Sequence, residues 1–255
     1  MTFTAGGEAY DRFMGRYSRK LAPCFADFAS VTPGQRALDV GCGPGALTVE
    51  LVERLGPEAV DAIDSSARFV AAASARQPGI RVQRATAEDL PFADGMFDAA
   101  LAQLVVHFMR DPLSGLREMA RVTRTGGVVA ACVWDHAGDG GPLAMFWAAV
   151  RELDPAADDE SYLAGAREGH LGQLFRAAGL REVQETALSV EVEHPTFDEW
   201  WEPFTLGVGP AGAYVERLDA EQVVRLARGV QNQAAAAPFI VSARAWAARG
   251  LAKST

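Results

Sequence analysis

The chain has 255 residues, with 24 Lys and Arg against 33 Asp and Glu, so its formal net charge is −9. This length predicts one or two domains that bury enough surface to fold without disulfides or metals. A composition of 49% hydrophobic and 22% charged residues excludes wholesale disorder, and the acidic balance argues against nucleic acid as a partner because it repels phosphate.

An apolar stripe marks the first predicted helix, over residues 8–29, where Phe13, Tyr17 and Leu21 recur four residues apart. Short apolar runs then alternate with helical patterns as far as residue 134. The predicted strands are 36–40, 59–63, 80–84, 97–102 and 128–134, and the predicted helices are 46–55, 66–76 and 113–123. This alternation predicts crossover units and a mostly parallel sheet with helices on both faces.

The alternation loosens after residue 134. The predicted elements here are helices at 143–153, 171–179 and 216–231, a long strand at 181–192, an aromatic segment at 196–209 and a last strand at 239–246. We expect a single domain over residues 1–255. Its parts are a helical cap at 8–29, a core at 30–134, and insertions with the last sheet strands at 135–255.

The most informative segment is the glycine-rich turn between the first strand and the first core helix, Gly41-Cys42-Gly43-Pro44-Gly45. Glycines there let the backbone approach a ligand closely, at the sheet edge where open α/β sheets bind ligands. Asp39 precedes the turn and either accepts amides of the turn or faces a ligand's ammonium group. Asp64 ends the second strand and either caps a helix or binds ribose hydroxyls; its distance from the turn favours the ribose.

These segments together resemble the motifs of class I S-adenosylmethionine-dependent methyltransferases. The segments that carry the resemblance are Leu38–Leu47, Ala62–Ser65, Ala85–Phe92, Phe97–Leu101 and Arg121–Gly127. They are most similar to the small-molecule, type 11, quinone-biosynthesis-like branch. The resemblance implies a Rossmann-like, seven-stranded sheet with a helical lid insertion. It also implies transfer of a methyl group from S-adenosylmethionine to a small-molecule acceptor by in-line displacement, with S-adenosylhomocysteine as product.

The resemblance also implies a set of cofactor-binding residues. They are Tyr10, Arg16, Tyr17, Asp39, Gly41, Cys42, Gly43, Asp64, Ser65, Thr86, Ala87, Glu88 and Gln103. Tyr10, Arg16 and Tyr17 are expected at the methionine carboxylate, unless the arginine of this helix simply faces water. Many relatives carry Gly-Asp-Ala where this chain has Ala85-Thr86-Ala87, so Thr86 or Glu88 replaces the usual acid at the adenine.

His107 is the best candidate for a general base, because it follows the fourth strand near the expected position of the methyl group. The alternative, that it only closes the pocket, is slightly favoured. The other histidines show no metal-ligand spacing, no metal is predicted, and they are assigned to the surface or lid. Phe197, Trp200, Trp201 and Phe204 line an acceptor pocket or form core, with the core favoured.

Two other functions remain open. The segment Gly41-x-Gly43-x-x-Ala46 formally fits a nicotinamide dinucleotide site, although Asp39 would repel a pyrophosphate there. Alternatively, the chain is a catalytically silent cofactor-binding partner of another protein.

The expected setting is the cytoplasm. The three cysteines form no CxxC pair, the first ten residues show no signal-peptide pattern, and the apolar runs are too short for a membrane span. We expect a small, uncharged or cationic acceptor, no nucleic-acid or membrane partner, and a monomer or homodimer.

Overall fold

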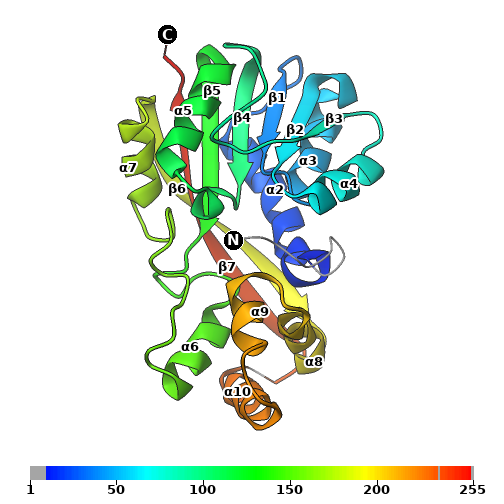
Figure 1. Cartoon of the computed structure of the whole chain (residues 1–255), viewed down its shortest axis with the longest axis vertical. Coiled ribbons are helices and arrows are strands. Elements are labelled where there is room, and N and C mark those ends of the chain that lie inside the picture. The colour runs from blue at the N-terminus through cyan, green and yellow to red at the C-terminus, as the bar shows by residue number, and fades with distance from the viewer. Residues whose placement is uncertain (1–9, 235, 254–255) are drawn as a thin grey trace.

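A seven-stranded sheet forms the centre of the computed structural model, which describes residues 10–234 and 236–253 (Figure 1). The strands are β1 (Ala37–Val40), β2 (Val60–Asp64), β3 (Arg81–Arg84), β4 (Phe97–Gln103), β5 (Thr123–Trp134), β6 (Arg181–His194) and β7 (Phe239–Leu251). They follow the order β3-β2-β1-β4-β5-β7-β6, with β7 antiparallel to both its neighbours and all other pairs parallel. This confirms the predicted Rossmann-like, mostly parallel sheet.

Helices cover both faces of this sheet, and a second group packs beyond its end (Figure 1). They are η1 (Asp11–Gly15), α2 (Arg16–Phe28), α3 (Ala46–Leu55), η2 (Pro57–Ala59), α4 (Ala67–Arg76), η3 (Val106–Phe108), α5 (Pro112–Val122), α6 (Ala144–Leu153), α7 (His170–Ala177), α8 (Phe197–Trp201), η4 (Glu202–Leu206), α9 (Gly209–Val215) and α10 (Ala220–Gln233). Leu21 of α2 and Leu51 of α3 lie in one buried cluster, whereas Leu116 of α5 and Phe175 of α7 lie in another. The two clusters are the cores on opposite faces, as expected for crossover connections.

The last two strands extend beyond the sheet and carry a second group of helices. Strand β5 ends where Trp134 pairs with Ala245, but β6 and β7 remain paired as far as His194 and Phe239. Helices α6, α8, α9 and α10 gather around this extension, below the main sheet in Figure 1. We call this group the lid lobe; it is the predicted helical lid insertion.

Aromatic packing holds the lid lobe together. The ring of Phe204 stacks on Phe146 with centroids 4.7 Å apart, and Trp200 lies 4.6 Å from Phe204. Trp200 and Phe204 are 3% and 2% exposed, so the prediction that they form core is confirmed. Such pairs contribute stability beyond the apolar area that they bury.

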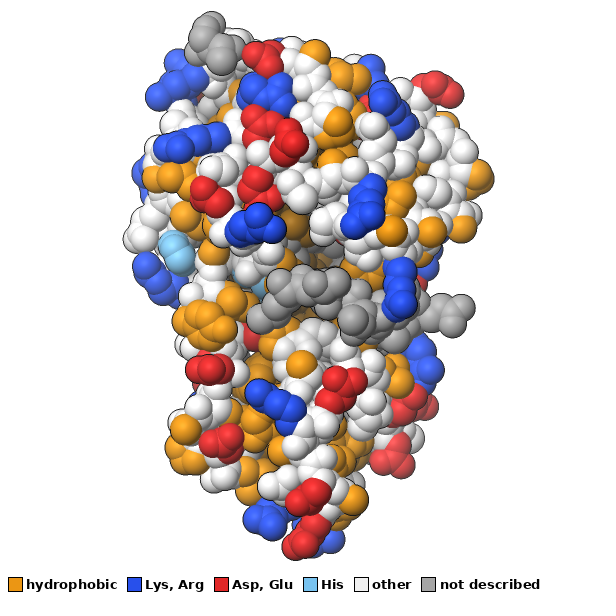
Figure 2. Space-filling model, in the orientation of Figure 1, with side chains coloured by type: hydrophobic (Ala, Val, Ile, Leu, Met, Phe, Trp, Pro, Cys, Tyr) orange, Lys and Arg blue, Asp and Glu red, His pale blue; other side chains and the backbone are white. Residues whose placement is uncertain are grey.

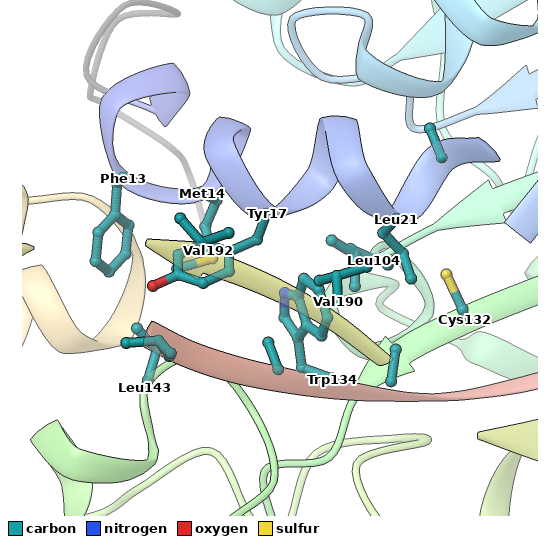
Figure 3. Packing of buried hydrophobic residues seen from close by; sticks show 14 of the residues in the cluster. Phe13, Met14, Tyr17, Leu21, Leu104, Cys132, Trp134, Leu143, Val190 and Val192 are labelled. Carbon is teal, nitrogen blue, oxygen red and sulfur yellow. The ribbon is translucent and has the colours of Figure 1, made fainter. Parts of the chain in front are cut away.

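The N-terminal cap packs across the junction between the main sheet and the lid lobe. Figure 3 shows Phe13, Tyr17 and Leu21 pointing from η1 and α2 toward the strands, with Trp134 and Val190 below them. All these side chains are buried, which confirms the predicted apolar stripe. Residues 8 and 9 of the predicted cap lie outside the described residues.

The structure differs from the predicted elements at several places. The strand predicted to begin at residue 128 begins at Thr123, and its register against β4 shifts between Phe97 and Ala99. The helix expected from residue 216 begins at Ala220, because Asp219 and Gln222 form a capping box. Helix α9 begins at Gly209-Pro210 and was not predicted, since a Gly-Pro pair normally marks a loop. Among the described residues, no helix combines the length and apolarity needed to cross a membrane.

Candidate active site

Three glycines of the glycine-rich turn have a left-handed backbone. Gly41, Gly43 and Gly45 have φ values of +71°, +54° and +97°. A Cβ on Gly41 would lie 2.5 Å from two methyl carbons of Val105, whereas a Cβ on Gly43 would meet no atom within 4 Å. Gly41 is therefore required by packing and backbone conformation together, and Gly43 leaves open space at the strand end.

Hydrogen bonds fix this turn to the neighbouring strand. The amides of Gly41 and Cys42 both donate to the carbonyl of Ile63, at 2.8 and 2.9 Å. Cys42 is buried, and burial raises the pKa of its thiol well above its ordinary value. Its side chain is thus an uncharged part of the turn.

Asp64 connects the turn to the beginning of α4. Its carboxylate accepts hydrogen bonds from the amides of Gly43 at 2.9 Å and Ser66 at 2.8 Å. Ser66 itself caps α4, so the alternative role of Asp64 as the helix cap is not needed. Ser65 is exposed, and its carbonyl accepts a hydrogen bond from Arg84. Burial raises the pKa of Asp64 despite these bonds.

Asp39 is a buried carboxylate with few hydrogen bonds to offset the cost of burying its charge. It is 1% exposed, and its Oδ2 accepts a hydrogen bond of 2.6 Å from the hydroxyl of Thr48. Burial, and to a smaller extent the nearby Asp64, raise its pKa to about 7. A cationic ligand beside Asp39 would favour its ionised form.

Gln103 provides a second buried acceptor on the same face of the sheet. The register pairs Asp39 with Leu101, and side chains two residues apart on a strand share a face. The Gln103 amide nitrogen donates to the carbonyl of Ser18, but its Oε1 has no hydrogen-bond partner among the described residues. The carboxylate of Asp39 and the unpaired amide oxygen of Gln103 could both accept hydrogen bonds from a ligand that carries an ammonium group.

Tyr10 lies over the same edge. Its ring contacts Phe69 of α4 edge-on, at 5.5 Å between centroids, and burial raises the pKa of its hydroxyl to about 12. Next to it, Arg76 forms an ion pair with Asp11 and donates to the carbonyl of Pro44 at 2.9 Å. The beginning of the cap is thereby tied to the glycine-rich turn.

The other two predicted cap residues face elsewhere. The hydroxyl of Tyr17 is 2.8 Å from Nε2 of His194, and Nη1 of Arg16 is 3.0 Å from Nδ1 of the same ring. This differs from their expected position at the methionine carboxylate of the cofactor. His194 was predicted to lie at the surface or in the lid. It is only 1% exposed, so the surface prediction is wrong. It lies at the end of β6, against the cap.

The predicted adenine loop forms a tight turn after β3. Thr86 makes an isolated bridge with Asp89, and Ala87 is 7% exposed. Oε1 of Glu88 accepts hydrogen bonds from the amides of Arg110 and Asp111, at 2.7 and 3.2 Å. Glu88 thus holds this loop to the segment before α5, and an adenine contact by Thr86 or Glu88 stays a prediction.

A hollow of about 420 Å³, partly open to solvent, lies between the cap, the main sheet and the lid lobe; we call it the acceptor pocket. Its lining residues are Tyr10, Phe13, Met14, Leu104, His107, Phe108, Trp134, His136, Leu143, Glu160, Val208, Gly209, Pro210 and Ala211. Most of them are apolar. His107 lies in η3, which follows β4, and is 8% exposed. Burial and the neighbouring His136 hold its pKa well below the ordinary value, so its ring is neutral.

Two polar residues of this pocket were missed by sequence reasoning. His136 follows β5 directly, so the rule that ligands bind beyond the carboxyl ends of strands would have suggested it. Glu160 lies between α6 and α7 and is 4% exposed; Trp147 donates to its Oε2 at 3.0 Å. No local motif marks Glu160, because the loop that carries it is brought to the pocket by the lid lobe. Among the described residues, no cluster of three or more His, Cys, Asp or Glu is arranged to hold a metal ion.

Comparisons with known proteins agree with this geometry. Residues 38–131 match the family model described as "Methyltransferase domain". The chain is 31% identical to 2-methyl-6-phytyl-1,4-hydroquinone methyltransferase 2 of Oryza sativa over 170 residues. The aligned residues make up 66% of this chain and 41% of the relative. It is 36% identical over 132 residues to demethylmenaquinone methyltransferase of Mycolicibacterium vanbaalenii, covering 52% of this chain and 53% of the relative. This chain thus spans about half, or less, of the length of these relatives.

Solved structures share the fold over a greater length. The YcgJ protein of Bacillus subtilis superimposes with a TM-score of 0.60 at 19% identity, over 94% of this chain and 99% of that one. A geranyl diphosphate methyltransferase in complex with S-adenosylmethionine gives a TM-score of 0.51 at 15% identity, over 91% and 85%. The strand order, the two acids flanking the glycine-rich turn and the family match converge: the chain has the Rossmann-like fold of methyltransferases, and its residues 38–131 are similar to the methyltransferase domain of type 11.

Proposed function

We propose that this protein transfers a methyl group from S-adenosylmethionine to a small-molecule acceptor. The observation that carries the proposal is the pair of buried acids, Asp39 and Asp64, at neighbouring strand ends around the Gly41–Gly45 turn. The acceptor pocket opens beside them, because Tyr10 lines it and also lies near Asp64. Donor and acceptor sites would then be adjacent, as in-line transfer requires.

Different residues of the chain would bind different parts of the cofactor. Asp39 and the free Oε1 of Gln103 would accept from its ammonium group, and Asp64 with Ser65 would contact the ribose hydroxyls. The glycine backbone would lie against its middle, where Cβ atoms are missing. A bound S-adenosylmethionine supplies a positively charged sulfur as leaving group, so the protein has only to align the acceptor and exclude water.

Several predicted contacts carry less support and stay proposals. Thr86, Ala87 and Glu88 would border the adenine from the loop after β3. Arg16 and Tyr17 would reach the methionine carboxylate only by leaving His194. The names of the two relatives point to hydroquinone and quinone acceptors, and an acceptor of low polarity would suit the apolar lining of the pocket.

Neither alternative gains support. A dinucleotide pyrophosphate would need amides of the glycine-rich turn, but the amide of Gly43 already donates to Asp64. The relatives named above are methyltransferases, which also speaks against a silent partner protein. A monomer or homodimer in the cytoplasm, without a nucleic-acid partner, remains our expectation. On the face drawn in Figure 2, Lys and Arg side chains are interspersed with Asp and Glu, unlike a phosphate-binding surface.

Calorimetry with the full chain tests the proposal. S-adenosylmethionine and S-adenosylhomocysteine should bind, NAD should not, and Asp64→Asn should weaken binding by roughly tenfold or more, because an amide has one acceptor oxygen where the carboxylate has two. Release of S-adenosylhomocysteine with a panel of phenols, amines and carboxylic acids then reports turnover. Binding of NAD alone would refute the proposal, and cofactor binding with silence on every acceptor would favour the partner-protein alternative.

A further inference from the structure

Another hollow lies between the cap, the end of β6 and the lid lobe, and we call it the junction hollow. Its polar lining residues are Arg12, Arg16, Tyr17, His194 and Trp200. Its volume is about 190 Å³, and it adjoins the acceptor pocket, because Phe13, Met14 and Leu143 line both. Among the described residues, no Asp or Glu side chain lines the junction hollow. It therefore differs from the proposed cofactor site, where Asp39 and Asp64 flank the glycine-rich turn.

The hydrogen bonds of the junction hollow have a fixed direction. A guanidinium group only donates, so Nη1 of Arg16, 3.0 Å from Nδ1 of His194, makes Nδ1 an acceptor. The ring is neutral, because burial and the nearby Arg16 lower the pKa of His194 to about 4. A neutral ring with an accepting Nδ1 carries its proton on Nε2. Nε2 therefore donates to the hydroxyl oxygen of Tyr17, at 2.8 Å.

Tyr17 is left with a donor that has no acceptor among the described residues. The indole of Trp200 also forms a hydrogen bond with its hydroxyl, and an indole N–H only donates. The oxygen of Tyr17 thus accepts from both neighbours, and neither of them accepts its O–H. Figure 3 shows the ring of Tyr17 directed from α2 toward Phe13 and Leu143, which also line the hollow. The O–H of Tyr17 is therefore available to a ligand in the junction hollow.

Arg16 adds a positive charge that has no acidic partner in the described part of the chain. Its Nε donates to the carbonyl of Arg12 at 3.0 Å and its Nη1 to His194, while Nη2 donates to no described residue. Arg12, one helical turn earlier, is instead paired with Glu202. Arg16 is half-buried, so water balances its charge only in part. The junction hollow thus combines two unused donors, Nη2 of Arg16 and the hydroxyl of Tyr17, with an excess of positive charge.

We propose that the junction hollow binds an oxyanion, a carboxylate or a phosphate, which accepts hydrogen bonds from Arg16 and Tyr17. An arginine that donates to a charged oxygen forms a hydrogen bond about twice as strong as a neutral one. An ammonium group would find no carboxylate in the lining and would be repelled by Arg16. The site lies outside the cofactor site and the acceptor pocket, so this inference does not depend on the proposed methyl transfer.

His194 is a positioning residue of this site. Both of its ring nitrogens are occupied, by Arg16 and Tyr17, and its ring stacks on Phe239 of β7 with centroids 5.4 Å apart. It is the last residue of β6 and is almost fully buried. The two donors are thereby held in place before a ligand arrives, which reduces the entropy that is lost on binding.

The oxyanion can come from two sources. It is either a free ion or the charged end of a molecule that also has an apolar part. The second source fits the walls, because Phe13, Met14 and Leu143 are buried apolar side chains that line both hollows. Inorganic phosphate and an alkyl phosphate distinguish the two sources, since they share the charged group and differ in the apolar part.

The first test uses the unaltered chain at constant ionic strength. Calorimetry measures the binding of inorganic phosphate, hexyl phosphate, hexanol and hexylamine. We expect hexyl phosphate to bind at least about tenfold more tightly than hexanol or hexylamine. Inorganic phosphate that binds within about threefold of hexyl phosphate would identify a free ion as the ligand, and weaker binding would identify the charged end of an apolar molecule. The proposal is overturned if hexanol or hexylamine binds as tightly as hexyl phosphate, or if neither phosphate binds.

The second test compares two variants of α2. Arg16→Gln and Arg19→Gln each remove one positive charge from the same helix, but Arg19 pairs with Asp11 and does not line the junction hollow. Arg16→Gln should weaken the binding of hexyl phosphate at least about tenfold, and Arg19→Gln by less than about threefold. Equal losses in the two variants would show that only the overall charge of the helix matters, and the site would then be refuted.

Tyr17→Phe tests the second donor. It removes the hydroxyl and keeps the ring, so the binding of hexyl phosphate should weaken roughly threefold to tenfold, as expected for one hydrogen bond from a neutral donor. Unchanged binding of hexyl phosphate would contradict the assigned role of the Tyr17 hydroxyl.

The affinity for S-adenosylhomocysteine, measured with every variant, separates this site from the methionine carboxylate, where the resemblance places Arg16 and Tyr17. Weaker binding of hexyl phosphate with unchanged cofactor affinity supports the junction hollow. Parallel losses in a variant that keeps a cooperative unfolding transition would assign both residues to the cofactor and overturn the inference. If the unaltered chain binds S-adenosylhomocysteine but neither phosphate, this inference fails and the proposed methyl transfer stands; if it binds hexyl phosphate but no cofactor, the proposed function fails and the oxyanion site stands.

Discussion

The turn around Gly41 and the acceptor pocket are built by opposite means. The turn and its two acids come from 27 consecutive residues, Asp39 to Ser65 included, and hydrogen bonds of the backbone and of both carboxylates hold them together. The pocket draws its lining from the cap, two strand ends, the α6–α7 loop and α9, which lie far apart in sequence. Local chemistry therefore determines the first region, and long-range packing determines the second.

This difference explains why the sequence of the pocket can vary more freely than the sequence of the turn. The turn has to keep left-handed glycines and a fixed contact with Val105, so its conformation leaves little freedom. The pocket has to keep only an apolar lining and its polar positions, because hydrophobic walls tolerate substitutions that conserve volume. A fold can thus retain one donor site while its acceptor changes.

The largest effect that we expect comes from Gly41→Ala. A Cβ in the left-handed region costs about 1–2 kcal/mol, and the overlap with Val105 adds about 1–3 kcal/mol. The free energy of unfolding, measured by urea titration, should fall by the sum, and the affinity for S-adenosylmethionine should fall with it. Gly34→Ala is the matched control, since Gly34 also has positive φ (+91°) but a Cβ there meets no atom within 4 Å. Equal losses in the two variants would show that packing against Val105 is unimportant.

The next effect concerns protons and Asp39. Its pKa is about 7 in the folded protein and near 3.8 when unfolded, so the folded state binds the extra proton between these values. The free energy of unfolding should therefore decrease as pH rises from about 4 to about 7, with a slope of up to about 1.4 kcal/mol per pH unit. Asp39→Asn should flatten this dependence.

Cofactor binding gives an independent measure of the same group. An ammonium beside Asp39 lowers its pKa, so binding at pH 6 should release up to about one proton. Calorimetry in two buffers of different ionisation enthalpy measures that number, and Asp39→Asn should reduce it. No proton release in the unaltered protein would argue that Asp39 does not meet a cation.

The same contrast decides what the sequence reveals. Strand ends, the turn and Asp64 follow one another in the chain, so spacing alone predicts their meeting, and the capping of α5 by Asp111 is equally local. Glu160 lacks any such signal, because it reaches the pocket only after β6 and β7 carry the lid lobe past β5. Tyr17 had a helical position that suited the cofactor, but His194, 177 residues later, is its partner.

A smaller effect is expected from Tyr17→Phe, which tests that partner. Removing the hydroxyl leaves Nε2 of buried His194 without its hydrogen bond and should lower the free energy of unfolding by about 1–2 kcal/mol. The affinity for S-adenosylmethionine should stay the same if Tyr17 only stabilises the packing of the cap at the junction between the main sheet and the lid lobe. A tenfold weaker affinity would instead restore Tyr17 to the cofactor site.

The smallest effect is expected at the surface link between cap and lid lobe. Arg12 and Glu202 form an exposed ion pair, while beneath it Phe13 packs edge-on against Phe204 at 4.9 Å. Exposed pairs contribute about 0–1 kcal/mol and are screened by salt, so Arg12→Met should change the free energy of unfolding by less than that. If the contact between Phe13 and Phe204 holds the cap to the lid lobe, the effect of Arg12→Met on the free energy of unfolding should vanish at high salt. A loss of several kcal/mol, measured by thermal unfolding at low and high salt, would mean that charge rather than aromatic packing joins the two regions.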